Sequence, residues 1–329
     1  MRYLTLDVFT STPFGGNQLA VFPDARGIPE SALLPITREF NFSEVSFCFP
    51  PAVDSHTRRV RIFTPGGELP FAGHPTIGTA AALALVEGAL RQRAPGHLLS
   101  DERTPPRPAP DEHGASAGKP IAGRFLFELG VGVVPVDVRI EAPELAWAEL
   151  SVAKLPELGP PVPTAVTMAD ILSLDVSDLV GGPLSPQAVS CGQPFLIVPV
   201  KTVDAVSRAR VKIDRWEQTL RKSWAPEIFV AARNPEVGSQ HWHARMFAPG
   251  INIAEDPATG SAAAAFGGWL ALKDAKRDGS FAWSIDQGIE MGRPSRIDVS
   301  ADKAEGAVTA VRVAGRAVLM GEGTLRDWA

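Results

Sequence analysis

One motif occurs twice in this chain, at an interval the size of a domain. Residues 61–85 read RIFTPGGELPFAGHPTIGTAAALAL, and residues 245–266 read RMFAPGINIAEDPATGSAAAAF. In each copy a strand-like run leads through a loop with Pro and Gly to a helix that is apolar almost all round, as buried helices are. Chance similarity between two Ala-rich helix starts is the alternative, and the match on both sides of the loop argues against it. The repeat therefore predicts two related halves, each with a strand, a loop and a central helix.

The two predicted central helices begin at matched polar positions. His74-Pro75 opens the first helix, expected over 76–90, and Asp256-Pro257 precedes the second, expected over 261–272. Proline suits a first helical position because its missing N–H would have no partner there. The free N–H groups at a buried helix start form an anion site. A pseudo-two-fold relation would bring both starts, with Thr79 and Ser261 one turn further in, to one cleft.

The remaining segments alternate between short strands and helices, which predicts an α+β fold with predominantly antiparallel strands. Thr167 is expected to cap the third helix. The expected strands cover residues 3–9, 19–22, 45–49, 58–63, 124–129, 133–140, 146–150, 187–190, 194–200, 227–232, 241–247, 281–286, 296–299, 307–313 and 317–320. The expected helices cover residues 29–40, 76–90, 202–208, 212–222 and 261–272, with one or two more across 167–179.

The segment 91–122 is rich in Pro, Gly and charge and has no periodicity. Such a segment is either a long flexible loop or a linker between the halves. We therefore expect an N-terminal half over 1–122, with the C-terminal strand 313–329 as a candidate addition, and a C-terminal half over 123–312.

Composition narrows the class of partner. The chain has 329 residues, 45 % of them apolar and 21 % charged, with a net charge of −5, which are the proportions of a globular protein. A net negative charge offers no electrostatic attraction to nucleic acid or to an anionic membrane, so a small molecule is the better partner. No apolar run approaches the ~20 residues of a membrane span, and the N-terminus reads as a strand and not as an export signal. We expect a cytoplasmic protein.

Metal and thiol chemistry have little support in the sequence. Cys48 and Cys191 are the only cysteines, and their apolar settings fit buried reduced thiols. His241 and His243 would point to one face of an extended segment, but no third ligand is apparent. We therefore predict no metal site.

Two further residues are candidates for the site. Glu44 follows the Phe42–Ser43 turn and precedes an apolar strand, where partial burial would raise its pKa. A carboxyl tuned in this way can exchange a proton near neutral pH, although a solvated strand-edge residue is the alternative. Asn17 follows two glycines and is either a turn residue or part of the site wall.

The segments DVFTSTPFGGNQLAVF and NFSEVSF, together with both copies of the repeat, resemble the landmark motifs of the phenazine biosynthesis PhzF-like family in order and spacing. The resemblance runs from the first strand to the last and spares mainly 91–122 and parts of 150–240. It implies a diaminopimelate epimerase-like fold. In that fold two similar domains, each a mainly antiparallel sheet rolled around a central helix, enclose an active site in the cleft between them.

The resemblance also implies roles for individual residues. Glu44 matches the catalytic acid/base of the family, and His74 and Asp256 match its polar active-site residues. The positions that bind substrate, largely through helix N-termini, correspond to Gly73, Gly260 and Ser261; we add Asn17 and Thr76 from the local patterns. Family members work without a metal or an organic cofactor and usually form homodimers. The expected function is a cofactor-independent isomerase that transfers a proton on a small carboxylated metabolite.

Two departures from the family pattern bear on this expectation. Gln18 stands where proline is usual, and Val45 stands where threonine is usual, which removes a hydroxyl beside Glu44. A racemase or epimerase of the same fold is a competing function, but such enzymes place a cysteine at each helix start, and this chain has none there. A non-catalytic binding module also stays open, because a fold does not determine a function.

Overall fold

The same order of strand pairings occurs twice along the chain. The computed structural model describes residues 1–93 and 121–326. The first half contains β1 (Arg2–Val8), β2 (Asn17–Phe22), α1 (Glu30–Phe40), β3 (Glu44–Phe49), β4 (Arg58–Thr64), β5 (Gly67–Leu69), α2 (Gly73–Arg93), β6 (Ile121–Leu129), β7 (Gly132–Ala142) and β8 (Leu145–Ser151). The second half contains β9 (Glu157–Leu158), α3 (Ala165–Leu172), η1 (Val176–Asp178), η2 (Gly182–Leu184), β10 (Gln187–Ser190), β11 (Pro194–Pro199), α4 (Val203–Arg208), α5 (Ile213–Thr219), β12 (Ile228–Arg233), β13 (His241–Ala248), η3 (Pro249–Ile251), β14 (Ile253–Asp256), α6 (Gly260–Lys273), β15 (Gly279–Gln287), η4 (Ile289–Met291), β16 (Ser295–Ala304) and β17 (Ala307–Thr324).

Strands β1 to β8 and β10 to β17 pair in the same way. In the first half β1–β2 is antiparallel, β2–β3 parallel, β3–β4 and β4–β5 antiparallel, β4–β6 parallel, and β6–β7 and β7–β8 antiparallel. The second half repeats this series from β10–β11 to β16–β17, with its parallel pairs at β11–β12 and β13–β15. The repeat seen in the sequence therefore extends over both halves, and most pairs are antiparallel, as predicted.

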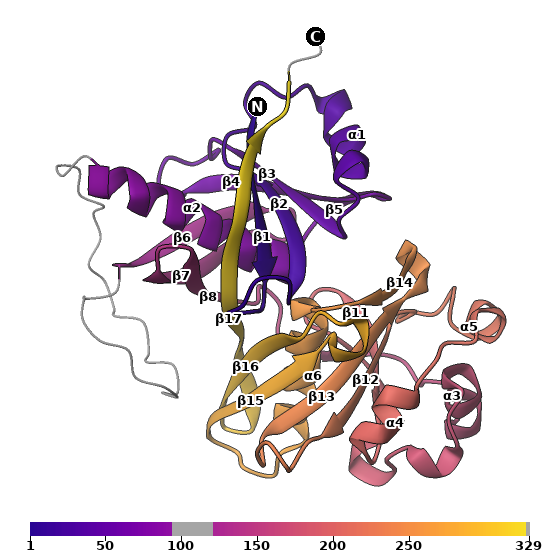
Figure 1. The fold of residues 1–329 in the computed structure, drawn as a ribbon. Coiled ribbons are helices and arrows are strands. Elements are labelled where there is room, and N and C mark those ends of the chain that lie inside the picture. Colours follow the sequence, from indigo (N-terminus) through magenta and orange to yellow (C-terminus); the bar gives the residue numbers. More distant parts are fainter. Residues whose placement is uncertain (94–120, 327–329) are drawn as a thin grey trace.

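Each half encloses one central helix. Helix α2 contacts β1 to β3, β6 to β8 and β17, and α6 contacts β10, β11 and β15 to β17. Small side chains dominate both helices, so the strands approach closely, and Ala262 to Ala265 of α6 are fully covered. Helix α1 covers the outer face of β3 and β4, and α4 occupies the matching place on β12 and β13 (Figure 1).

The last strand connects the halves. Two strands were expected at 307–313 and 317–320, but β17 is a single long strand that pairs with β16, then β8, then β1. Gly315, between the two expected strands, makes this path possible, because a Cβ there would lie 2.3 Å from Cδ1 of Phe9. The segment that follows β17 lies beside the start of β1, where the Met1 ammonium donates to the Leu325 carbonyl at 2.7 Å (Figure 1).

The strand pairings differ from the expected boundary at residue 122. Strand β6 pairs with β4, β8 pairs with β17, and α2 packs on β7 and β8. Residues 121–151 therefore complete the sheet around the first central helix, because without them one side of that apolar helix would face solvent. The segment predicted to be a loop or linker, 91–122, lies outside the described residues except at its ends.

Two helix boundaries were also wrong. The first central helix begins at Gly73 and not at residue 76, since the Ala72 carbonyl accepts hydrogen bonds from both N and Oγ1 of Thr76, at 3.4 and 2.7 Å. Of the one or two helices expected across 167–179, the structure has two, α3 and the short η1, and α3 ends at Leu172 because Ser173 adopts a left-handed conformation with φ of 58°. Its N-cap is Thr164, whose hydroxyl accepts from the Thr167 backbone.

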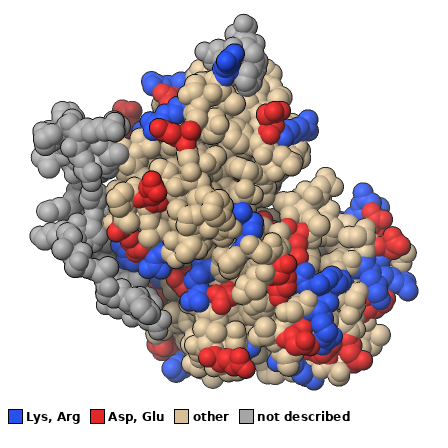
Figure 2. Space-filling model, viewed as in Figure 1, with Lys and Arg blue, Asp and Glu red and all other residues tan. Residues whose placement is uncertain are grey.

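The surface shows no preference for one sign of charge on the face in Figure 2. Lys and Arg side chains alternate there with Asp and Glu, and no continuous basic area appears among the described residues of that face. Within residues 1–93 and 121–326, no helix has both the length and the apolar character of a bilayer-crossing segment.

The close backbone contact between the two helix starts generates a stability prediction. A Cβ on Gly73 would lie 2.8 Å from Cα of Gly260, so Gly73→Ala must push the two helix starts apart. We expect this change to lower the free energy of unfolding by about 1–3 kcal/mol, measured by denaturant titration. Gly123→Ala is the matched control, because nothing lies within 4 Å of a Cβ there. Equal stability of the two variants would contradict the close contact.

Candidate active site

The first turns of the two central helices meet in the interior. A Cβ on Gly73 would stand 2.8 Å from both Cα of Gly260 and the backbone nitrogen of Ser261. The two helix starts therefore face each other, as the repeat predicts. Around this contact the structure gathers Glu44 at the start of β3, His74 in the first turn of α2, and Asp256 at the end of β14; all three are buried.

Glu44 and His74 face each other without hydrogen bonding. Oε2 of Glu44 lies 3.4 Å from Nε2 of His74, and both atoms are buried without a hydrogen-bond partner among the described residues. Burial raises the pKa of Glu44, the charge of Asp256 acts in the same direction, and the Ser43 hydroxyl opposes both. Burial lowers the pKa of His74 to about 3, against a hydrogen bond with the Gln18 backbone. At neutral pH the contact thus favours a protonated carboxyl and a neutral imidazole over an ion pair.

Asn17 joins the two halves behind these groups. Its Nδ2 donates to Oδ1 of Asp256 at 2.8 Å and to the Ala258 carbonyl at 3.1 Å, and lies 3.3 Å from Nδ1 of His74. Its Oδ1 accepts from the Ser43 hydroxyl at 3.0 Å. The amide is almost fully buried, so it holds His74 and Asp256 in place without water.

Asp256 is surrounded by hydrogen bonds from its own half. Its Oδ2 accepts from Oγ1 of Thr259 at 2.5 Å, and its backbone carbonyl accepts from Nε2 of Gln287 at 2.7 Å. Burial raises the pKa of Asp256, and the hydrogen bonds from Thr259 and Asn17 lower it in part. The site therefore contains two carboxyls, Glu44 and Asp256, whose pKa values burial raises above the ordinary range.

These groups line one small cavity. Its volume of about 20 Å³ suffices for roughly one water molecule. Most of the predicted site residues lie on its wall, namely Glu44, Gly73, His74, Asp256, Gly260 and Ser261. Asn17 lies behind the wall, Thr76 turns its hydroxyl back to the Ala72 carbonyl, and Thr79 is fully buried away from it.

Sequence reasoning missed several polar side chains of this site. Thr259 belongs to the repeated motif, whereas Gln287 comes from β15 and had no local signal. Gln193 and Glu227 also line the cavity. Burial raises the pKa of Glu227 to about 7, and a hydrogen bond with the Gly250 backbone opposes the shift. The available signal was the position of Glu227 directly before an apolar strand, as with Glu44.

The departure at Val45 does not affect the cavity. The Val45 side chain is fully buried on the opposite face of β3, where it packs with Phe22 and Phe47 beneath α1. A hydroxyl at this position would not reach the cavity from that face.

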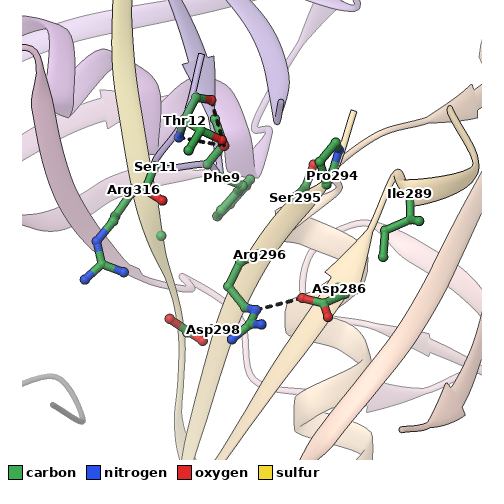
Figure 3. A pocket seen from close by; sticks show the side chains of 12 residues that line it. Phe9, Ser11, Thr12, Asp286, Ile289, Pro294, Ser295, Arg296, Asp298 and Arg316 are labelled. Carbon is green, nitrogen blue, oxygen red and sulfur yellow. Dashed lines mark hydrogen bonds and ion pairs between the residues drawn. The ribbon is translucent and has the colours of Figure 1, made fainter. Parts of the chain in front are cut away.

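A larger hollow of about 380 Å³ lies elsewhere, between the β1–β2 turn and the start of β16 (Figure 3). None of the predicted site residues lines it. Its cationic side chains are already paired, because Nε of Arg296 lies 2.7 Å from Oδ1 of Asp286 and Nε of Arg316 lies 2.7 Å from Oε2 of Glu141. The smaller cavity is therefore the better candidate site.

The remaining histidines and cysteines have other environments. His241 pairs with Asp286 at 2.6 Å and His243 with Glu290 at 2.7 Å, and the described part of the chain holds no group of three or more metal-ligating side chains. Burial raises the pKa of Cys48 and of Cys191 to about 12. Neither thiol lines the cavity.

Known proteins resemble this chain along its whole length. The family model described as phenazine biosynthesis-like protein, PhzC-PhzF, matches residues 6–95 and 114–323. An uncharacterized isomerase of Mesorhizobium japonicum is 36% identical over 98% of both chains. The trans-2,3-dihydro-3-hydroxyanthranilate isomerase of Pseudomonas aeruginosa is 30% identical, again over 98% of both. The crystal structure of the PhzF-family phenazine biosynthesis protein of Bacillus anthracis has a TM-score of 0.78 and 25% identity, with 99% of each chain covered. The chain therefore belongs to the phenazine biosynthesis-like family and is a PhzF-like isomerase.

Proposed function

We propose that this isomerase moves a proton on a small carboxylated metabolite, with Glu44 as both acid and base. The observation that carries the proposal is the Glu44 carboxyl, which is desolvated, has an unpartnered oxygen and faces His74 where the two helix starts meet. Desolvation brings the pKa of such a carboxyl closer to neutral pH, where a general acid/base works best.

The helix starts are suited to the carboxylate of the substrate. No side chain caps the first turn of α6, so the backbone N–H groups of Gly260 and Ser261 stay available at the cavity. The helix dipole adds a partial positive charge at the same place. A neutral His74 would add a hydrogen bond without a charge of its own. Holding one end of the substrate here would place a C–H bond against Glu44.

The proton transfer itself needs one carboxyl. The ionised Glu44 removes a proton from a carbon next to a double bond or carboxyl group, and the electron pair of the C–H bond moves into the substrate. The protonated Glu44 then returns the proton to another carbon, and the double bond ends in a new position. No atom is gained or lost, as an isomerisation requires.

The relative from Pseudomonas aeruginosa is named for an isomerisation of trans-2,3-dihydro-3-hydroxyanthranilate. We propose cyclic or linear carboxylates that bear amino or hydroxyl groups as the substrate class for this chain, and that compound as the first to test. The present cavity of about 20 Å³ is far smaller than such a molecule. Binding would therefore require the walls of the cavity to separate.

A racemase using two thiols is a weaker candidate. Both cysteines are buried outside the cavity, and their raised pKa values of about 12 leave almost no thiolate at neutral pH. A non-catalytic binding module is the second alternative. That alternative is an outcome of the following test.

We expect Glu44→Gln to reduce turnover by ~10²-fold or more, because the amide keeps the shape of the side chain but cannot exchange a proton. The measurement is isomerisation in deuterated water over a panel of amino and hydroxy carboxylates, starting with trans-2,3-dihydro-3-hydroxyanthranilate. Deuterium should enter the product made by the wild-type protein. Glu144→Gln, a change at an exposed carboxyl, is the control and should keep full activity.

Two results would decide against this mechanism. Unchanged turnover in Glu44→Gln would leave His74 and Asp256 as the remaining acid/base candidates. Binding of panel members by the wild-type protein without any deuterium incorporation or conversion would favour the binding module.

The protonation of Glu44 also predicts a pH dependence of stability. Because burial raises the pKa of Glu44 above its ordinary value of 4.5, the folded state holds a proton that the unfolded state releases as the pH rises. Stability is therefore lost on going from about pH 4.5 toward neutral pH. The side chain of Glu44→Gln cannot ionise. We therefore expect the free energy of unfolding of this variant to rise relative to that of the wild type as the pH increases over this range. Parallel curves for the two proteins would show that Glu44 is not desolvated.

A further inference from the structure

Glu227 occupies the place in the second half that Glu44 occupies in the first. The residue after Glu44 lies opposite Phe63 across β3 and β4, and the residue after Glu227 lies opposite Phe247 across β12 and β13. Phe63 and Phe247 are matched positions of the repeated motif. The two carboxyls thus start equivalent strands, and both line the same cavity.

The neighbouring strand repeats the correspondence. Asn17 begins β2 after Gly16, and Gln193 precedes β11 after Gly192; both glycines have positive φ, of 63° and 118°. Gln193 lines the cavity together with Glu227. The second half therefore presents an amide and a carboxyl to the cavity, in the positions that Asn17 and Glu44 hold in the first half.

Glu227 is buried and only partly satisfied. The residue is 4% exposed, and its Oε2 has no hydrogen-bond partner within the described ranges. Its Oε1 lies so close to Gly250 that a Cβ there would be 2.6 Å away. No cationic side chain of the described residues forms an ion pair with it, and apolar residues such as Phe195 and Ile251 share the wall. A buried carboxyl oxygen without a hydrogen-bond partner destabilises the fold. Such groups are typical of sites that bind a ligand.

The surroundings of the two carboxyls differ. Burial and the charge of Asp256 both raise the pKa of Glu44, whereas burial alone raises the pKa of Glu227. His74 faces Glu44 at 3.4 Å, and the counterpart of His74 in the repeat is Asp256, which is bound to Thr259 and Asn17. Glu227 therefore stands apart from the proton-transfer group while sharing its cavity.

We propose that Glu227 determines substrate specificity by binding an amino group of the substrate, with Gln193 beside it. This inference rests on the proposed function, in which a carboxylated substrate occupies the cavity. An amino group supplies the hydrogen-bond donor that the unpartnered oxygen lacks and, when protonated, the missing positive charge. Fixing a carboxylate at the helix starts and an amino group at Glu227 would hold the substrate at two points, with the carbon skeleton beside Glu44.

The test uses benzoate and its 2-, 3- and 4-amino derivatives, with binding measured by calorimetry. We expect the wild-type protein to bind at least one amino derivative about tenfold or more tighter than benzoate, because a site built for a donor rejects an analogue that lacks it. Glu227→Leu should reduce the preference to about twofold or less and leave benzoate binding unchanged; Glu227→Gln should retain a part of it. Glu290→Gln is the matched control, because Oε2 of Glu290 is also buried without a partner but lies outside the cavity.

The outcomes separate this inference from the proposed function. A wild-type protein without the preference, including one that binds none of the four compounds, overturns the inference, as does a preference that survives Glu227→Leu. Removing a buried unpartnered carboxyl should raise the melting temperature, whereas a purely structural role for Glu227 predicts a fall and no change in preference. If Glu227→Leu does not fold, Glu227→Gln carries the comparison. Glu44→Gln should keep the preference for amino derivatives while losing turnover. The acid/base role is therefore tested by Glu44→Gln, and the specificity role by Glu227→Leu.

Discussion

The contact between Gly73 and Gly260 is the constraint on which the site depends. A side chain at Gly73 would meet the backbone of Gly260 and Ser261 at 2.8 Å, so only glycine allows the two helix starts to come this close. The contact places two sets of backbone N–H groups in one region of the interior. It also brings His74 and Asp256, from opposite halves of the chain, to the same amide of Asn17. A site of this kind does not exist in either half alone.

Burial then sets the chemistry of the groups that meet there. It raises the pKa of Glu44 and Asp256 and lowers that of His74, so that the polar side chains around the cavity tend toward their neutral forms. Neutral groups can donate and accept hydrogen bonds to a substrate anion without repelling it. The same desolvation brings the pKa of a carboxyl toward the pH at which an acid/base catalyst is most effective. The site is therefore less stable than an apolar core of the same size would be, as catalytic sites commonly are.

The two halves share a path of the chain but have diverged in their side chains. His74 in one repeat corresponds to Asp256 in the other, and Asn17 corresponds to Gln193. Glu44 and Glu227 are alike in type and position, yet only Glu44 lies against a histidine and another carboxyl. In the proposed mechanism this asymmetry would let Glu44 exchange protons while Glu227 recognises an amino group of the substrate.

The sequence by itself determined the repeated strand–loop–helix unit, the buried central helices, most strands, and the family to which Glu44, His74 and Asp256 belong. Those features are readable because periodicity, loop residues and motif strings are local. The tertiary structure decided the rest. It joined β6 to β8 to the first half, merged two expected strands into β17, and brought Gln287 and Glu227 to the site. Each of these depends on which segments pair across long stretches of chain and on which side chains lose water there, and neither is written in the neighbouring residues.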